Sequence, residues 1–242
     1  MQDKALETRA PTSVDAPPNA VASSVPGPKP SGRTGLSPRR AVWSHDEVAL
    51  LLIDYQKEMF EGIRSETGPE LVDLNTRLLI KTARALDIPV VLSTVGVEMG
   101  VNGPTRDSIT DLLPGATVLD RSSMNAWEDA PFHAATLATG RRRLVFGALY
   151  TEICLAYPVI EALQEGFEVM FIADAVGGRS QVAHATAIDR LVAAGAVPNT
   201  ALALVTELFR DWKTDEAAKV RPIIIWYLEE LNKLELADGR PG

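Results

Sequence analysis

The segment Leu144-Val-Phe-Gly-Ala-Leu-Tyr-Thr-Glu-Ile-Cys154-Leu-Ala-Tyr-Pro158, followed by Val169-Met-Phe-Ile-Ala-Asp174, decides the fold. It begins with a short apolar run that ends at Gly147, which is typical of a strand buried on both faces. Thr151 is a residue type that often caps a helix, and apolar residues then recur at helical spacing as far as Phe167. Gly166 ends this helix before a second apolar run. The segment therefore predicts a strand, a turn, a helix and a second strand.

Cys154 is the only cysteine, and it lies in the first turn of the predicted helix, just beyond the carboxyl end of the predicted strand. Ligands of open α/β sheets bind at that edge of the sheet. Because a helix N-terminus favours a thiolate over a thiol, the position predicts a nucleophilic cysteine with a lowered pKa. The alternative is a buried structural cysteine.

Length and composition limit the class of protein. A chain of 242 residues can bury a full core in one α/β domain, and 46% hydrophobic with 23% charged residues is ordinary for a globular protein. The net charge of −8 disfavours a nucleic-acid partner. No apolar run approaches the roughly 18 residues that a membrane span needs. A single cysteine is typical of a reducing compartment, so we expect a cytoplasmic protein with no membrane partner.

Residues 1–40 differ in composition from the rest. They hold seven of the sixteen prolines and show neither a helical nor a strand period, which predicts a disordered Pro-rich tail. Arg39-Arg40 is the pair found in twin-arginine export signals, but the polar Trp43-Ser-His-Asp-Glu47 that follows is unlike the core of a signal peptide. Residues 41–242 are therefore predicted to form one domain.

Apolar runs and helical patterns alternate through this predicted domain. Besides the cysteine segment, strands are predicted at 48–54, 90–94 and 116–119 and helices at 72–86, 108–113, 131–139, 184–194 and 222–236, whereas 201–207 fits either. Strands that are apolar throughout and alternate with helices indicate an α/β protein with a mostly parallel sheet covered on both faces.

Asp54, Arg121 and Cys154 each stand at the end of a predicted strand. The carboxyl ends of parallel strands share one edge of a sheet, so these side chains can converge although they are far apart in sequence. An acid, a cation and a thiol at one site make a nucleophile with its base and an electrostatic partner. Separately, Asp54 could be a helix cap and Arg121 a surface residue.

Three motifs carry a family resemblance. They are Leu50-Leu-Leu-Ile-Asp54-Tyr-Gln56, Arg121-Ser-Ser-Met-Asn125-Ala-Trp127 and Gly147-Ala-Leu-Tyr-Thr151-Glu-Ile-Cys154. Over about residues 45–215 the sequence resembles the isochorismatase-like cysteine hydrolases. The Asn-Ala-Trp, Cys-Leu-Ala-Tyr-Pro and Arg210-Asp-Trp212 elements resemble the YcaC-like branch of that superfamily.

The resemblance implies a three-layer α/β/α fold and a Cys-Asp-Lys catalytic triad. Cys154 and Asp54 fill two places of the triad, but Arg121 stands in the lysine position. Arginine supplies a positive charge but cannot lose its proton. The resemblance also implies a cis peptide at Leu149–Tyr150 and an oxyanion hole formed by the backbone N–H groups of Tyr150 and Cys154.

Gln56, Asn125 and Trp127 stand next to the catalytic positions in sequence, so we expect them to bind substrate, with Trp127 as an apolar wall. The alternative for Trp127 is a place in the core or in a subunit interface.

Relatives that act as nicotinamidases bind a metal ion through an aspartate and paired histidines. The three histidines here, His45, His133 and His184, form no Asp-x-His motif and lie outside the segments expected at the strand edge. We interpret them as structural or surface residues, and we predict neither a metal ion nor another cofactor.

The leading functional prediction is a hydrolase that cleaves a small amide or related C–N bond through a Cys154 thioester, with Asp54 as base. One alternative is enol-ether hydrolysis of the isochorismatase type. Another is a weakly active or inactive family member with a binding or assembly role, because of Arg121. The apolar segment Pro222–Leu228 and the family both favour a homo-oligomer that acts on a small molecule.

Overall fold

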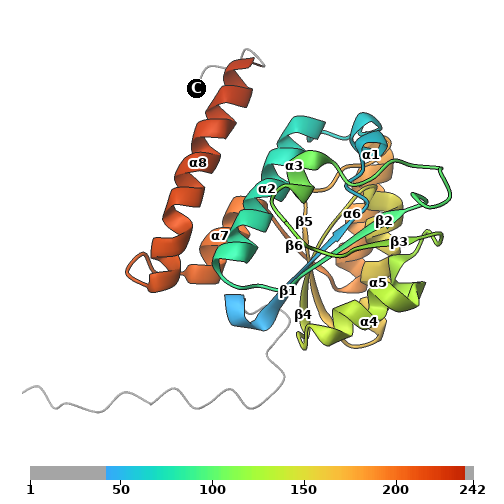
Figure 1. Ribbon diagram of the computed structural model, residues 1–242, viewed down its shortest axis with the longest axis horizontal. Coiled ribbons are helices and arrows are strands. Elements are labelled where there is room, and N and C mark those ends of the chain that lie inside the picture. Colours follow the sequence, from blue (N-terminus) through green and yellow to red (C-terminus); the bar gives the residue numbers. More distant parts are fainter. Residues whose placement is uncertain (1–41, 238–242) are drawn as a thin grey trace, which may run out of the picture. The chain divides into compact units, whose positions relative to one another are not determined.

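The computed structural model describes residues 42–237 (Figure 1). The predicted tail, residues 1–40, lies outside the described residues. The described part contains one sheet of six parallel strands in the order β3-β2-β1-β4-β5-β6. The strands are β1 (Val48–Ile53), β2 (Val90–Val95), β3 (Val118–Arg121), β4 (Arg143–Ala148), β5 (Glu168–Ile172) and β6 (Val197–Asn199). The predicted parallel sheet is confirmed.

The helices follow the predicted alternation. They are α1 (Lys57–Glu61), α2 (Pro69–Ala85), α3 (Asp107–Thr110), α4 (Ala130–Ala138), α5 (Ala156–Gln164), α6 (Gln181–Ala194), α7 (Ala201–Phe209) and α8 (Asp215–Ala237). Short turns are η1 (His45–Glu47), η2 (Ala126–Glu128) and the π turn η3 (Thr151–Leu155). The segment that fitted either a helix or a strand is the helix α7. Both α1 and β6 were missed, because five and three residues are too few to show a period.

Alternate residues of β1 point into two separate cores, which makes the fold three-layered (Figure 1). Leu50 and Leu52 pack in a core shared with residues of α2, α7 and α8. Leu51 and Ile53 pack in the other core, with residues of α4, α5 and α6. All four side chains are nearly inaccessible to solvent, which explains why β1 is apolar at every position.

The order of the strands places the candidate site at the middle of the sheet. From β1 the chain adds β2 and then β3 on one side, and it returns to add β4, β5 and β6 on the other. The topological switch point lies between β1 and β4, and open α/β sheets bind ligands outside the carboxyl ends of the strands at such a point. The segments that follow β1 and β4 hold Asp54 and Cys154.

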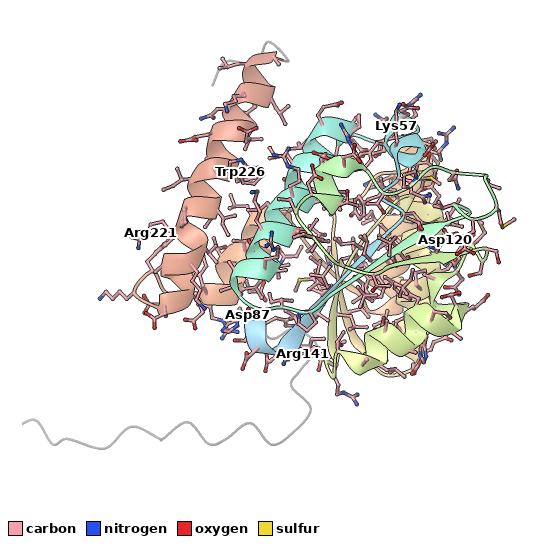
Figure 2. The ribbon with its side chains drawn as sticks, in the orientation of Figure 1. Lys57, Asp87, Asp120, Arg141, Arg221 and Trp226 are labelled. Atoms are coloured by element: carbon pink, nitrogen blue, oxygen red, sulfur yellow. The ribbon has the colours of Figure 1, made fainter. Side chains whose placement is uncertain are left out.

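The last helix, α8, packs on α2 and α7. Its Tyr227 hydroxyl donates a hydrogen bond to Asn75 of α2 at 2.8 Å. Trp226 of α8 points toward α2, where Arg77 and Lys81 lie 5.0 and 4.5 Å from its ring centroid (Figure 2). Between residues 42 and 237, no helix is long and apolar enough to cross a bilayer.

Candidate active site

Asp54 is the first residue after β1, and it is fully buried. Its φ of 61° lies in the left-handed region, which few residues other than glycine adopt, although aspartate and asparagine tolerate it better than most. Both carboxylate oxygens accept hydrogen bonds from Arg121, from Nη1 at 2.6 Å and from Nη2 at 2.7 Å. This two-bond geometry holds the carboxylate in one orientation.

Arg121 reaches Asp54 from the edge strand β3, across the intervening strand β2. Its Nη1 also donates to two residues of β2, to the carbonyl oxygen of Thr94 at 3.0 Å and to the Ser93 hydroxyl at 3.2 Å. Burial acts to lower the pKa of Arg121, but its hydrogen bond with Asp54 and the negative charge of that carboxylate outweigh burial and raise the pKa. The guanidinium therefore stays charged. Its buried Nε–H has no acceptor among residues 42–237.

Cys154 lies in the π turn η3, just before α5, and only 4% of its surface is exposed. Burial raises the pKa of its thiol well above the ordinary value, and the charge of Asp54 and a hydrogen bond to that carboxylate raise it further. The Arg121 charge and the backbone amide of Tyr150 act in the opposite direction but are weaker. The prediction of a lowered pKa is therefore wrong. It considered only the helix N-terminus and took no account of the burial of the thiol or of the neighbouring carboxylate. At rest, Cys154 is therefore a neutral thiol under the influence of the Asp54 carboxylate.

The turn that carries Cys154 contains the expected cis peptide between Leu149 and Tyr150. The backbone amide of Tyr150, one of the two donors predicted for the oxyanion hole, acts to lower the pKa of the Cys154 thiol. Thr151 is not the predicted N-cap, because Tyr150 occupies that position. Instead the Thr151 amide donates to the carbonyl oxygen of Gly177, and its hydroxyl lies 2.9 Å from Nδ1 of His184.

Gln56 is fully buried, and its side-chain amide bonds to backbone groups. Nε2 donates to the carbonyl oxygens of Val95 and Gly103 at 3.1 and 2.6 Å, and Oε1 accepts from the Val95 amide at 3.2 Å. These bonds join the end of β2 to the loop 96–105. Gln56 therefore positions the loop 96–105, and substrate binding by this residue stays a prediction from sequence.

Asn125 and Trp127 also have internal roles. The Asn125 side chain accepts a hydrogen bond from the Trp127 amide at 3.1 Å and donates to Glu128 at 3.2 Å, so it caps η2. The Trp127 indole donates to Glu165 at 2.9 Å. Its ring packs against the rings of three residues, His133, Phe146 and Phe167. Trp127 thus packs in the core, as in the alternative interpretation. Substrate binding by Asn125 and Trp127 stays a prediction from sequence.

The three histidines lie in different places. His45 is 3.9 Å from Glu216 and His133 is 2.9 Å from Glu165, and both are partly exposed. His184 is buried and contacts the turn before Cys154, so the interpretation that it lies away from the strand edge is wrong. Within the described part of the chain, no group of three His, Cys, Asp or Glu side chains could hold a metal ion.

Sequence reasoning missed Ser93 and Thr94, which accept hydrogen bonds from Arg121 and so orient its guanidinium toward Asp54. Both are buried polar residues at the end of a strand that otherwise reads as apolar. A polar pair at the carboxyl end of a buried strand was therefore an available signal. No comparable signal marked His184, whose partner lies in a different segment of the chain.

The chain is similar in sequence to known proteins. The family model described as the Isochorismatase domain matches residues 48–202. Probable hydrolase YcaC of Escherichia coli is 33% identical over 171 residues, which cover 70% of this chain and 81% of that protein.

Two solved structures share the fold at 30% sequence identity. YcaC from Pseudomonas aeruginosa, solved with hexane-2,5-diol and covalent acrylamide, has a TM-score of 0.74 over 83% of this chain and 98% of its own. YcaC from E. coli, described as an octameric hydrolase of unknown specificity, has a TM-score of 0.72 over 81% and 97%.

Proposed function

This chain belongs to the isochorismatase family and is a hydrolase of that family, and from this premise we propose that it cleaves a small amide or related C–N bond through a Cys154 thioester. The observation that carries the proposal is that the pKa of the buried Cys154 thiol is raised by the carboxylate of Asp54, which Arg121 holds by two hydrogen bonds. A thiol beside a positioned base is the arrangement of nucleophilic catalysis.

In the first step Asp54 takes the thiol proton as the sulfur attacks the carbonyl carbon of the substrate. The S–C bond forms, and the carbonyl π electrons move to oxygen. Backbone N–H groups of Tyr150 and Cys154 are the proposed donors to this oxyanion. When the intermediate collapses, the C–N bond breaks and the nitrogen takes the proton from Asp54. The products of this step are an amine, or ammonia, and a thioester.

In the second step Asp54 takes a proton from water as the water oxygen attacks the thioester carbonyl. The C–S bond then breaks, and the sulfur regains a proton from Asp54. The carboxylic acid leaves, so the net reaction is hydrolysis of the C–N bond by one water molecule. Arg121 donates no proton in this scheme. It holds Asp54 in place and balances its charge, which suits an arginine in the position where the family resemblance implies lysine.

The test is ammonia release from a panel of small primary amides, measured for the wild type beside Cys154→Ala and Asp54→Asn. Asparagine tolerates the left-handed backbone at position 54, so the second variant removes the base without straining the turn. We expect release by the wild type alone. Release that persists in Cys154→Ala would contradict the thioester mechanism.

A chemical probe separates a dead site from a missing substrate. The Pseudomonas aeruginosa relative carries covalent acrylamide, and acrylamide is an electrophile that thiols attack. We expect mass spectrometry to locate an acrylamide adduct of this chain on Cys154. If the chain neither forms the adduct nor hydrolyses any amide, a binding or assembly role replaces the proposal. If the adduct forms but no amide is hydrolysed, Cys154 is still a nucleophile, and the amides in the panel are not its substrates.

We also propose that the chain acts as a homo-oligomer. The E. coli relative is octameric. In this chain Ile225 and Leu228 are about half exposed on the face of α8 that does not pack on α2, as expected for a subunit contact.

A further inference from the structure

One buried titratable side chain next to the candidate site has no part in the mechanism above. His184 lies in the first turn of α6, and its Nδ1 is 2.9 Å from the hydroxyl oxygen of Thr151. Thr151 is fully buried and is the first residue of the π turn that carries Cys154. The contact therefore joins α6 to the nucleophile turn three residues before the sulfur.

The surroundings leave His184 little freedom to move. Ser180 caps α6 by accepting a hydrogen bond from the Ala183 amide at 3.0 Å, and its carbonyl oxygen accepts from the His184 amide at 3.0 Å. The Gly178 backbone packs so closely that an added Cβ would lie 2.9 Å from the His184 Cβ and 2.7 Å from Glu152. The backbone and Cβ of His184 are thus fixed by the cap of α6 and by the Gly178 backbone.

The available hydrogen-bond partners indicate which group donates in the contact between the Thr151 hydroxyl and His184 Nδ1. His184 is the only partner of the Thr151 hydroxyl within the described part of the chain. A buried hydroxyl proton needs an acceptor, so the O–H donates to Nδ1, and the ring is the neutral tautomer with its proton on Nε2. If the ring gained a second proton, Nδ1 would lose its lone pair and the hydroxyl proton would lose its acceptor.

We infer that His184 is a positioning residue: as a neutral acceptor it fixes Thr151, and through Thr151 it fixes the turn that aims Cys154. The role concerns the same site as the proposed function, and its effect on turnover rests on that function. The hydrogen bond itself, with its tautomer, does not rest on it.

The charges around His184 fix the direction of its pH dependence. Burial lowers its pKa, while the negative charges of Glu66, before α2, and Glu152, in the π turn, oppose that effect. Arg179 bonds to Glu152 through its backbone amide, and its guanidinium lies over the Tyr150 ring. Because the folded pKa lies below the ordinary value of about 6.5, the neutral ring is present at neutral pH and is lost on acidification.

The direct test is nitrogen-15 NMR of the full chain labelled at histidine. The sequence has three histidines, so His45→Gln and His133→Gln variants assign the signals. At neutral pH we expect the His184 signals of a neutral ring protonated on Nε2. A neutral ring protonated on Nδ1, or a charged ring, at neutral pH would overturn the inference. This result is independent of whether any amide is hydrolysed.

The kinetic test compares three variants on whichever amide the wild type hydrolyses. His184→Leu removes the acceptor, and Thr151→Val removes the donor with little change of shape. Each should lower kcat by about tenfold to a hundredfold, the range expected when a reacting group is misplaced by about 1 Å. The double variant should lose no more than either single one, because both break the same contact. His184→Asn keeps an acceptor near the position of Nδ1 and should retain most of the activity.

The pH profile separates positioning from mere stability. Between about pH 5 and pH 8, activity of the wild type should fall on the acid side, whereas His184→Asn should keep a flatter acid limb. His133→Asn, on the exposed pair with Glu165, is the matched control and should keep the wild-type profile. If Thr151→Val lowers the melting temperature but leaves kcat unchanged, the contact is only structural and the inference fails.

Discussion

At the scale of single residues, the site consists of the buried ion pair of Arg121 with Asp54 and the thiol of Cys154. Arg121 and Asp54 are both nearly inaccessible to solvent and neutralise each other, so the thiol meets a carboxylate whose charge is already balanced. Burial nevertheless keeps Cys154 protonated. Such a cysteine is activated by transfer of its proton to a base during the reaction, not by resting as a thiolate.

The first prediction concerns the reactivity of Cys154 toward iodoacetamide. Because its pKa is raised, alkylation should be slower than that of free cysteine at neutral pH and should still be rising at the alkaline end of the profile. Asp54→Asn removes the carboxylate charge that raises the pKa, so this variant should alkylate faster than the wild type while it loses hydrolysis. A plateau of wild-type alkylation below the pKa of free cysteine would contradict the raised pKa.

The second prediction separates the charge of Arg121 from its shape. Arg121→Met leaves Asp54 buried without its partner, and removal of one member of a buried ion pair lowers the free energy of unfolding by about 3–5 kcal/mol. Arg121→Lys keeps the charge, so it should be closer to the wild type both in urea unfolding and in ammonia release. Equal losses for the two variants would show that the two-bond geometry matters more than the charge.

At the scale of elements, the loop 96–105 borders the site, and side-chain hydrogen bonds hold it near both of its ends. Gln56 bonds it to the end of β2. Asp120, near the end of β3, accepts from the amides of Val97 and Glu98 and from the Thr94 hydroxyl. These hydrogen bonds lower the pKa of Asp120 despite opposition from its limited burial. The loop is therefore held by side chains that flank Asp54 and Arg121, two of the proposed catalytic residues, in sequence.

The third prediction tests this attachment. Gln56→Met removes the side-chain partner of the Val95 amide and of the Gly103 carbonyl, and buried unpaired groups of this kind cost about 1–3 kcal/mol each. We expect a lower free energy of unfolding and new proteolytic cleavage within residues 96–105. Tyr227→Phe is the matched control, because it breaks one hydrogen bond between α8 and α2. It should lower stability without exposing the loop, and cleavage of the loop in both variants would refute a specific role for Gln56.

At the scale of the whole molecule, α8 lies beyond the part of the chain that matches the family domain, residues 48–202. Ala217, Val220, Ile224 and Tyr227 form its buried face. Ile225 and Leu228 are on another face and remain exposed. A helix with apolar side chains on two faces has one more apolar face than its own domain uses.

The fourth prediction is that this second face joins subunits. The chain mass is 26.1 kDa, and light scattering after size exclusion should give a multiple of it. Ile225→Glu with Leu228→Glu should reduce the multiple, because two charges would have to be buried in the contact. Lys219→Glu, an exposed polar position of the same helix, is the control for added charge and should leave the assembly intact. A monomeric wild type would refute the subunit contact.

The sequence by itself determined most of the order of the elements and three of the residues at the site. Apolar runs located β1, β2, β4 and β5, because strands buried on both faces show no alternation. Motif spacing located Asp54, Arg121 and Cys154, which the fold brings together.

The tertiary structure alone decided what each polar group does. The partners of Gln56, Thr151 and Trp127 lie between 33 and 47 residues away in the chain. No local pattern encodes such contacts, so two of the predicted substrate ligands and the predicted helix cap turned out to bond within the protein. The pKa of Cys154 was likewise decided by burial and by Asp54, which contribute only once separate strands pack side by side.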